Sequence, residues 1–145
     1  MKFNIKNSIF KKKPFLIAEI SSNHNGSISQ AKKLILTAKK NGADAVKLQT
    51  YLPSTMTLNS KKKDFMMNSG IWKGKSLWDL YEKAHTPYLW HKELFDFAKK
   101  NKITCFSTPF DESAINLLEK LKCPFYKVAS LEITDLPLIR AIAKT

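Results

Sequence analysis

The chain has 145 residues, 43% of them hydrophobic, and its 25 Lys and Arg against 12 Asp and Glu give a net charge of +13. This length accommodates one domain with a hydrophobic core, and the low glycine, proline and cysteine contents exclude collagen, a disulfide scaffold and a disordered tail. No apolar run approaches the roughly 18 residues that cross a bilayer, and the run after Lys11–Lys13 is too short for a secretion signal and contains Glu19.

Four apolar runs alternate with helical patterns along the chain. Strands are predicted at residues 15–20, 43–48, 103–107 and 125–129. A helix with Ser27 and Gln30 as a capping box ends at Asn41-Gly42, and the next begins near Thr86-Pro87, with Thr86 as its cap. The last two helices are predicted to begin at Asp111 and near Asp135, the latter with Pro137 in its first turn.

This alternation predicts an α/β fold with parallel strands joined by crossover helices. An open doubly wound sheet is disfavoured because no glycine-rich fingerprint follows any strand. A closed barrel needs about 250 residues. We therefore expect the first half of a (β/α)8 TIM barrel, with about four βα units from residue 14 to residue 145, in a truncated chain with an uncovered inner face.

Residues 51–85 form an unusually long connection, which is typical of a lid or binding loop. The segment contains three large aromatic residues and two nearby lysines: Trp72, Trp78, Tyr81, Lys73 and Lys75. Such a set could stack on a sugar and hold an anion, or it could form a small satellite cluster that pins the loop. The sequence leaves both interpretations open.

Polar residues interrupt the predicted strands near their carboxyl ends, where buried parallel strands are expected to be aliphatic. They are Glu19, Lys47, Gln49, Ser107, Thr108, Lys127 and Ser130. The carboxyl ends of barrel strands are where active sites form. The alternative is an ion pair between Glu19 and either Lys47 or Lys127, without a site.

Two lysines and neighbouring hydroxyls suit a small anion with two negative groups, such as a phosphate and a carboxylate. Glu19 is the candidate for proton transfer, and Asn23 and Asn25 have the donors and acceptors that polyol recognition needs. His24 could be a base or a ligand, but a structural role is the more common one. No three-ligand metal site is visible, so a metal would need ligands from elsewhere.

The positive charge is compatible with nucleic acid, an anionic membrane or anionic substrates. Arg140 is the only arginine, and base reading favours arginine, so we expect no nucleic-acid partner and a mostly solvated lysine surface. A basic, non-catalytic binding module remains the alternative from another class, and a non-functional remnant a third. Cys105 and Cys123 lack ligand-like spacing and are expected to be reduced packing residues of a cytoplasmic protein.

Four motifs in this order carry a specific resemblance: AEISSNHNGS, VKLQTY, FSTPFDESA and YKVASLEITDLPLI. They resemble the N-terminal half of the sialic acid synthase (NeuB-like) family, from about Pro14 to the end of the chain. The stretch IWKGKSLWDLYEKAHTPYLWH is most similar to the pseudaminic acid synthase branch. Legionaminic or N-acetylneuraminic acid synthase is the alternative within the family.

The resemblance implies a condensation of phosphoenolpyruvate with an N-acetylated amino-hexose to a nine-carbon 2-keto acid and phosphate, in surface glycan biosynthesis. Lys47, Thr108, Lys127 and Ser130 would bind phosphoenolpyruvate. Glu19 and Lys127 would be catalytic, with Glu19 acting on the sugar carbonyl or the attacking water. The sugar site would include Asn23, Asn25, Gln49 and Tyr51.

The resemblance also implies parts that this chain does not contain. The family has further barrel strands with two metal-binding histidines, and a C-terminal antifreeze-like domain that reaches across a homodimer. A divalent metal, Mn²⁺ or Mg²⁺, is therefore expected with ligands outside this chain. The polypeptide alone is expected to be inactive.

Overall fold

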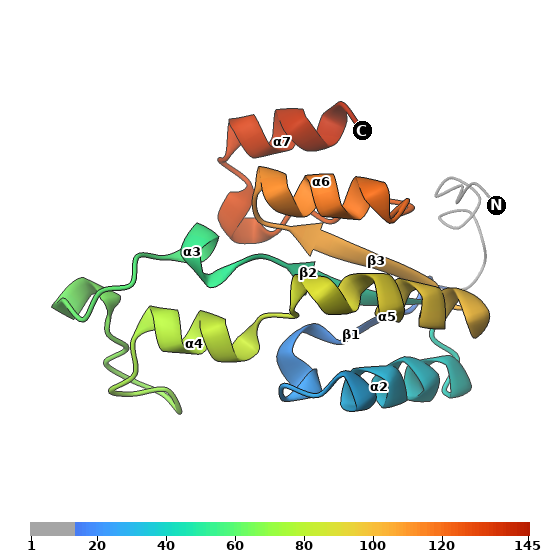
Figure 1. The fold of residues 1–145 in the computed structure, drawn as a ribbon, viewed down its shortest axis with the longest axis horizontal. Coiled ribbons are helices and arrows are strands. Elements are labelled where there is room, and N and C mark those ends of the chain that lie inside the picture. Colours follow the sequence, from blue (N-terminus) through green and yellow to red (C-terminus); the bar gives the residue numbers. More distant parts are fainter. Residues whose placement is uncertain (1–13) are drawn as a thin grey trace.

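The computed structural model describes residues 14–145 and shows a parallel sheet flanked by helices (Figure 1). Lys11–Lys13, part of the rejected secretion signal, lie outside the described residues. The elements are β1 (Ile17–Glu19), η1 (Ser21–His24), α2 (Ile28–Lys40), β2 (Ala45–Thr50), α3 (Pro53–Met56), η2 (Lys63–Phe65), α4 (Leu77–Ala84), α5 (Tyr88–Lys100), β3 (Thr104–Pro109), α6 (Glu112–Lys120), η3 (Ser130–Glu132) and α7 (Leu136–Ala143).

The sheet has the order β1-β2-β3, and both strand pairs are parallel. Helix α2 connects β1 to β2, and the connection from β2 to β3 contains α5, as the alternation of strands and helices predicts. The three strands lie within a few residues of their predicted positions. The predicted α/β architecture is therefore confirmed for these units.

The prediction of a fourth strand at residues 125–129 is wrong. Residues 125–129 make one isolated parallel bridge, between Ser107 and Tyr126, with the Lys127 N–H donating to the Ser107 carbonyl at 3.3 Å. The Phe125 carbonyl also accepts a bond from the Cys123 thiol at 3.2 Å. The segment thus follows the direction of β3 without forming a ladder.

The main core lies between the sheet and helices α2 and α5. It is made of Ile20, Ala31, Ile35, Val46, Leu48, Leu94, Ala98, Ile103 and Cys105. A second buried cluster joins β2 and β3 to α6 through Ala45, Phe106, Leu118 and Cys123. Both cysteines are buried and unbridged, and burial raises the pKa of each thiol, as expected of packing residues.

Local capping signals explain most helix starts. Asp111 and Asp135 accept bonds from the backbone N–H groups of Ala114 and Leu138 at 2.8 and 3.0 Å, as predicted for α6 and α7. Ser27 caps α2 through the Gln30 N–H at 3.2 Å. The full capping box is wrong, because the Ser27 N–H donates to the His24 carbonyl at 2.9 Å.

The predicted Thr86 cap is also wrong. Helix α5 begins at Tyr88, its N-cap position is Pro87, and no side chain caps it. The Thr86 side chain is buried, and its hydroxyl lies 3.3 Å from His24 Nε2. Thr86 therefore joins α5 to the loop after β1 instead of capping the helix.

Residues 51–85 carry α3, η2 and α4 and extend past the carboxyl ends of the strands (Figure 1). The Tyr51 ring packs edge-on against Tyr81, with centroids 5.8 Å apart. The Lys83 ammonium lies 5.4 Å from the Trp72 ring centroid. Both contacts lie within the 51–85 segment and are compatible with the satellite-cluster interpretation of its aromatic residues. Across residues 14–145, the helices are too short or too polar to traverse a lipid bilayer.

Candidate functional site at the strand carboxyl ends

Strand register places several of the polar residues on one face of the sheet. Glu19 pairs with Lys47, and Gln49 pairs with Thr108. Because side chains alternate along a strand and paired residues point to the same side, these four share a face. In β2, Val46, Leu48 and Thr50 are buried on the opposite, helix-covered face. Lys47 and Gln49 therefore share a face, as their spacing predicts.

Glu19 and Lys47 form an ion pair through Glu19 Oε2. The Lys47 side chain is 12% exposed and that of Glu19 is 43% exposed. The other carboxylate oxygen, Oε1, accepts a bond from the Ser21 hydroxyl at 2.6 Å. The pairing expected under the ion-pair alternative thus exists, but one partner remains open to solvent.

Adjacent residues of β3 have opposite roles. The Thr108 side chain is buried, and its hydroxyl oxygen has no hydrogen-bond partner within the described part of the chain. Such unsatisfied buried hydroxyls are uncommon, and strand register places this one on the face that carries the Glu19–Lys47 pair. Ser107 faces the helices, where its hydroxyl lies 2.6 Å from that of Thr50.

Ser107, Thr50 and His91 form a buried chain of hydrogen bonds between the sheet and α5. Thr50 Oγ1 lies 2.8 Å from His91 Nε2, and His91 Nδ1 lies 3.1 Å from the Pro87 carbonyl. Since that carbonyl can only accept, Nδ1 carries the proton and Nε2 accepts from Thr50. Burial lowers the pKa of His91 to about 4, so the ring is neutral near pH 7.

Lys127 lies on the same face of the sheet as Thr108. Its neighbour Tyr126 bonds through its phenol to Glu119 of α6, on the helix side. The Phe125 ring packs against that of Phe106, with centroids 4.2 Å apart. Alternation therefore places Lys127 on the face of Phe106 and Thr108. Lys127 is exposed, and so is Ser130 at the start of η3.

Glu132 is a site candidate that the sequence reading missed. Its Oε2 atom is buried, and no residue from 14 to 145 donates a hydrogen bond to it. Burial raises the pKa of this carboxyl, while the Lys127 charge acts in the opposite direction. The available signal was an acid five residues after Lys127, in the turn that follows the strand-like segment.

The residues expected to bind sugar differ in their surroundings. Asn23 and Asn25 are exposed in and after η1, and Gln49 is partly exposed. Tyr51 is only 3% exposed and packs between Tyr81 and Phe110, and burial raises the pKa of its phenol to about 12. Tyr51 thus packs the start of the 51–85 segment between Tyr81 of α4 and Phe110, at the end of β3.

His24 has a structural position. Its Nδ1 accepts the Gly26 N–H at 3.1 Å, its Nε2 lies near Thr86, and its ring packs edge-on against that of Trp90, with centroids 5.4 Å apart. Burial, and then the nearby His85, lowers the pKa of His24. These contacts agree with the structural interpretation of this histidine.

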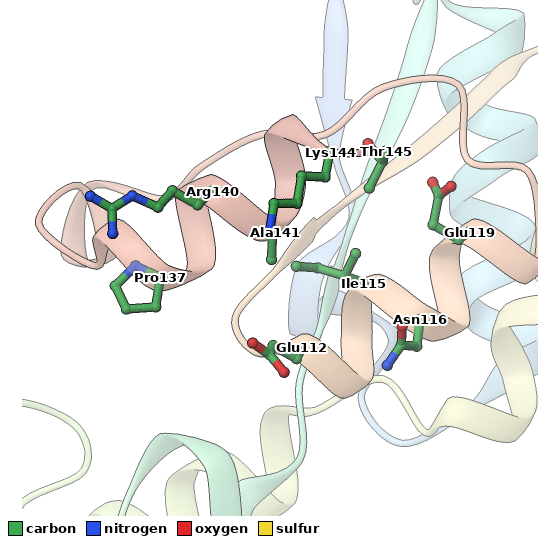
Figure 2. Close-up of a pocket in the computed structure, with 9 residues that line it drawn as sticks. All are labelled: Glu112, Ile115, Asn116, Glu119, Pro137, Arg140, Ala141, Lys144 and Thr145. Atoms are coloured by element: carbon green, nitrogen blue, oxygen red, sulfur yellow. The ribbon is translucent and has the colours of Figure 1, made fainter.

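Figure 2 shows a cavity of about 560 Å³ that other residues line. It runs between α6 and α7, with Glu112 and Glu119 from α6 opposite Arg140 and Lys144 from α7. None of the expected site residues lines it. It is a groove between two helices, whereas the polar face of the sheet opens at the strand ends.

Candidate metal ligands are sparse in the part of the chain that the structure covers. No three His, Cys, Asp or Glu side chains come together there. Glu19 is held by Ser21 and Lys47, and His24 and His91 are engaged in hydrogen bonds. These residues do not fit a divalent metal site.

A parallel-strand α/β unit with charged and hydroxyl residues on one face at the strand ends is the arrangement found in the first units of a (β/α)8 barrel. The NeuB family model matches residues 34–145, and the chain belongs to this family. It is 50% identical over 132 residues to pseudaminic acid synthase of Helicobacter pylori, and 49% identical over 133 residues to that of Campylobacter jejuni. It is 38% identical to N,N'-diacetyllegionaminic acid synthase of C. jejuni.

The alignments cover 91–92% of this chain and 39–40% of those relatives, so the chain spans about two fifths of their length. The N-acetylneuraminic acid synthetase structure from Leptospira borgpetersenii superposes with a TM-score of 0.74 at 27% identity, covering 90% of this chain and 41% of that one. A putative spore coat polysaccharide biosynthesis protein E from Chromobacterium violaceum gives the same TM-score and identity over 92% and 39%. The expected partial TIM-barrel fold is thus confirmed.

Proposed function

We propose that this chain supplies part of the active site of a pseudaminic acid synthase. The reaction condenses phosphoenolpyruvate with an N-acetylated amino-hexose to give a nine-carbon 2-keto acid and phosphate. Family membership and about 50% identity to two pseudaminic acid synthases support this choice over a legionaminic or neuraminic acid synthase. The carrying observation is the buried, unpartnered Thr108 hydroxyl on the face of Lys47 and Lys127.

Phosphoenolpyruvate has a phosphate and a carboxylate, and the polar face has cations and donors for both. We assign Lys127, Thr108 and Ser130 to the phosphoenolpyruvate anion, with Lys47 contributing charge from β2. Lys47 already has Glu19 as a counter-charge, so it would add attraction without being a free cation. The unpartnered Thr108 hydroxyl would gain the bond that it lacks.

The sugar site would lie on the side of β1 and the loop that follows it. Asn23 and Asn25 present amides from this loop, and Gln49 presents one from β2. Tyr51 would support the wall formed by the 51–85 segment, the proposed lid. Glu19 would act on the acceptor carbonyl or on the attacking water. The raised pKa of Glu132 makes that carboxyl a second candidate for proton transfer beside Lys127.

The chemistry balances with these groups. The enol carbon of phosphoenolpyruvate forms a bond to the sugar carbonyl carbon, whose oxygen takes up a proton. Water then adds to the resulting cation and loses one proton, which leaves a hydroxyl on the carbon that bears the phosphate. Phosphate leaves with cleavage of its C–O bond while this hydroxyl gives its proton to the phosphate and becomes the keto oxygen. Lys127 and Lys47 stabilise negative charge as it moves onto the departing phosphate.

A divalent metal, Mn²⁺ or Mg²⁺, would polarise the sugar aldehyde in such a reaction. The described residues do not form its site, so its ligands would come from outside this chain. We also propose a homodimer in the cytoplasm, without nucleic-acid or membrane partners. These assignments rest on the family resemblance and not on contacts in the structure.

The test is Lys127→Ala in the full-length protein, with Lys120→Ala, an exposed lysine at the end of α6, as the matched control. We expect Lys127→Ala to abolish calorimetrically measured phosphoenolpyruvate binding, and Lys120→Ala to preserve it. Unchanged binding in Lys127→Ala contradicts the proposal. Steeply salt-dependent DNA or RNA binding that survives the substitution would instead support the non-catalytic module.

The acceptor is tested separately by mass spectrometry of the product. The unsubstituted protein is offered several N-acetylated hexosamines together with phosphoenolpyruvate. We expect turnover with an N-acetylated amino-hexose other than N-acetylmannosamine. Turnover of N-acetylmannosamine alone would contradict the pseudaminic assignment while leaving the reaction type intact.

A further inference from the structure

The Glu19 carboxylate is fixed at both of its oxygens. Oε2 pairs with the Lys47 ammonium on the neighbouring strand, and Oε1 accepts the Ser21 hydroxyl proton at 2.6 Å. The two donors come from different sides, one across the sheet and one from the turn after β1. The carboxylate therefore cannot rotate about its terminal torsion without breaking a bond.

Solvation does not require the bond from Ser21. The Glu19 side chain is 43% exposed, so water could satisfy both oxygens. A hydrogen bond at an exposed carboxylate adds little to stability, because it replaces one to water. What it adds is a fixed orientation of the group.

Ser21 makes this bond from an unfavourable backbone conformation. Its φ is +37°, in the left-handed region where residues with a Cβ are uncommon. The backbone is held on both sides, because the Ile20 N–H donates to the Lys47 carbonyl at 3.0 Å and the Asn23 N–H to the Ile20 carbonyl at 2.9 Å. Glycine would adopt this φ without strain. A strained non-glycine residue whose hydroxyl meets the candidate catalytic carboxylate points to a functional constraint.

We infer that Ser21 is a positioning residue for Glu19. Its hydroxyl holds Oε1 while Lys47 holds Oε2, so that the carboxylate keeps one orientation toward the sugar acceptor. This inference rests on the proposed function, which gives Glu19 its chemical role. Ser21 itself touches no reacting atom.

The test compares Ser21→Ala, Ser21→Gly and Ser22→Ala in the full-length protein. Alanine removes the hydroxyl and keeps the strain, and glycine removes both. Ser22 is exposed and adjacent, and it serves as the matched control. We expect both Ser21 variants to lose about tenfold or more in kcat with the KM for phosphoenolpyruvate within about twofold of wild type, and Ser22→Ala to keep both values.

Thermal unfolding separates positioning from folding. Ser21→Gly relieves the strain, so its melting temperature should at least equal that of the unsubstituted protein while its kcat falls. If the melting temperature and the kcat of Ser21→Gly fall together, Ser21 has a structural role and the inference is wrong. Full kcat in both Ser21 variants would also overturn the inference.

A spectroscopic readout keeps this test independent of the proposed reaction. The ¹³C carboxyl resonance of Glu19, assigned by its loss in Glu19→Gln, should move at constant pH toward that of exposed glutamates in Ser21→Ala and Ser21→Gly. If the unsubstituted protein has no synthase activity but this shift occurs, the proposed function fails and the hydrogen bond stands. An unchanged resonance overturns the inference directly.

Discussion

Lys47 shows how one residue links packing to the proposed chemistry. Its side chain is 12% exposed, and a cation this buried needs a counter-charge. Glu19 supplies it from the adjacent strand, at the same level of the sheet. Because Glu19 keeps contact with solvent, the pair can face a ligand, which a fully enclosed ion pair could not do.

His91 gives a pH dependence that can be measured at the residue scale. Its pKa is about 4 in the folded chain and near 6.5 when unfolded, so the unfolded chain binds more protons between these values. Stability is therefore expected to fall as pH decreases from 6.5 toward 4, by about 2–3 kcal/mol at pH 4.5. Urea unfolding at pH 7.5 and pH 4.5 measures the difference.

His91→Gln is the control for this pH dependence. The variant lacks the titrating ring, so its unfolding free energy should be lower at pH 7.5 but change less on acidification. Some dependence should persist, because the pKa of His24 is lowered as well. An equally steep loss in His91→Gln would show that other groups account for it.

At the element scale, the Asp111 side chain caps α6 and also binds a residue of α3. Its carboxylate accepts bonds from the Ala114 N–H at 2.8 Å, the Ser113 hydroxyl at 2.6 Å and the Thr55 hydroxyl of α3 at 2.7 Å. It therefore joins β3, α6 and the start of the 51–85 segment. Loss of this side chain affects a helix end and a connection between elements.

Asp111→Ala is expected to lower the unfolding free energy by about 1–2 kcal/mol, the usual cost of losing an N-cap. Asp96→Ala is the matched control, since Asp96 pairs with Lys92 on the exposed side of α5 and should cost no more than about 0.5 kcal/mol. Urea unfolding under identical conditions compares the two variants. Equal losses would contradict the capping role.

The features predictable from sequence are the local ones. Amphipathic spacing and the Asp111 and Asp135 caps lie within a few residues, so α2, α5, α6, α7 and the three strands lie close to their predicted positions. Helices α3 and α4, within residues 51–85, were not predicted. The 125–129 segment was misassigned because a strand depends on a ladder with distant residues. The sequence did not show that Ser107 and Thr108 face opposite sides of the sheet in different roles, since only the strand register tells which of two adjacent side chains faces the helices.

The candidate site was predictable in composition but not in its contacts. Glu19, Lys47 and Thr108 stand out in sequence as polar interruptions of apolar strands. The Ser21 bond depends on a positive φ, and the burial of the Glu132 oxygen depends on a turn that no periodic pattern describes. Ser21 and Glu132 both lie in short 3-10 segments, one after β1 and one after the strand-like residues 125–129, where sequence rules are weakest.

On the scale of the whole molecule, the sheet separates two environments. One face packs against α2 and α5 and holds the core and the His91 hydrogen bonds. The other presents the Glu19–Lys47 pair, Gln49 and Thr108 toward the strand carboxyl ends. The account depends on this second face binding the anionic substrate.

A crystal structure of the full-length protein with phosphoenolpyruvate tests that claim most directly. The account predicts phosphate or carboxylate oxygens within hydrogen-bond distance of Lys127 Nζ and Thr108 Oγ1, near Lys47. Phosphoenolpyruvate bound elsewhere, for example in the groove between α6 and α7, with Lys127 and Thr108 untouched, would contradict it.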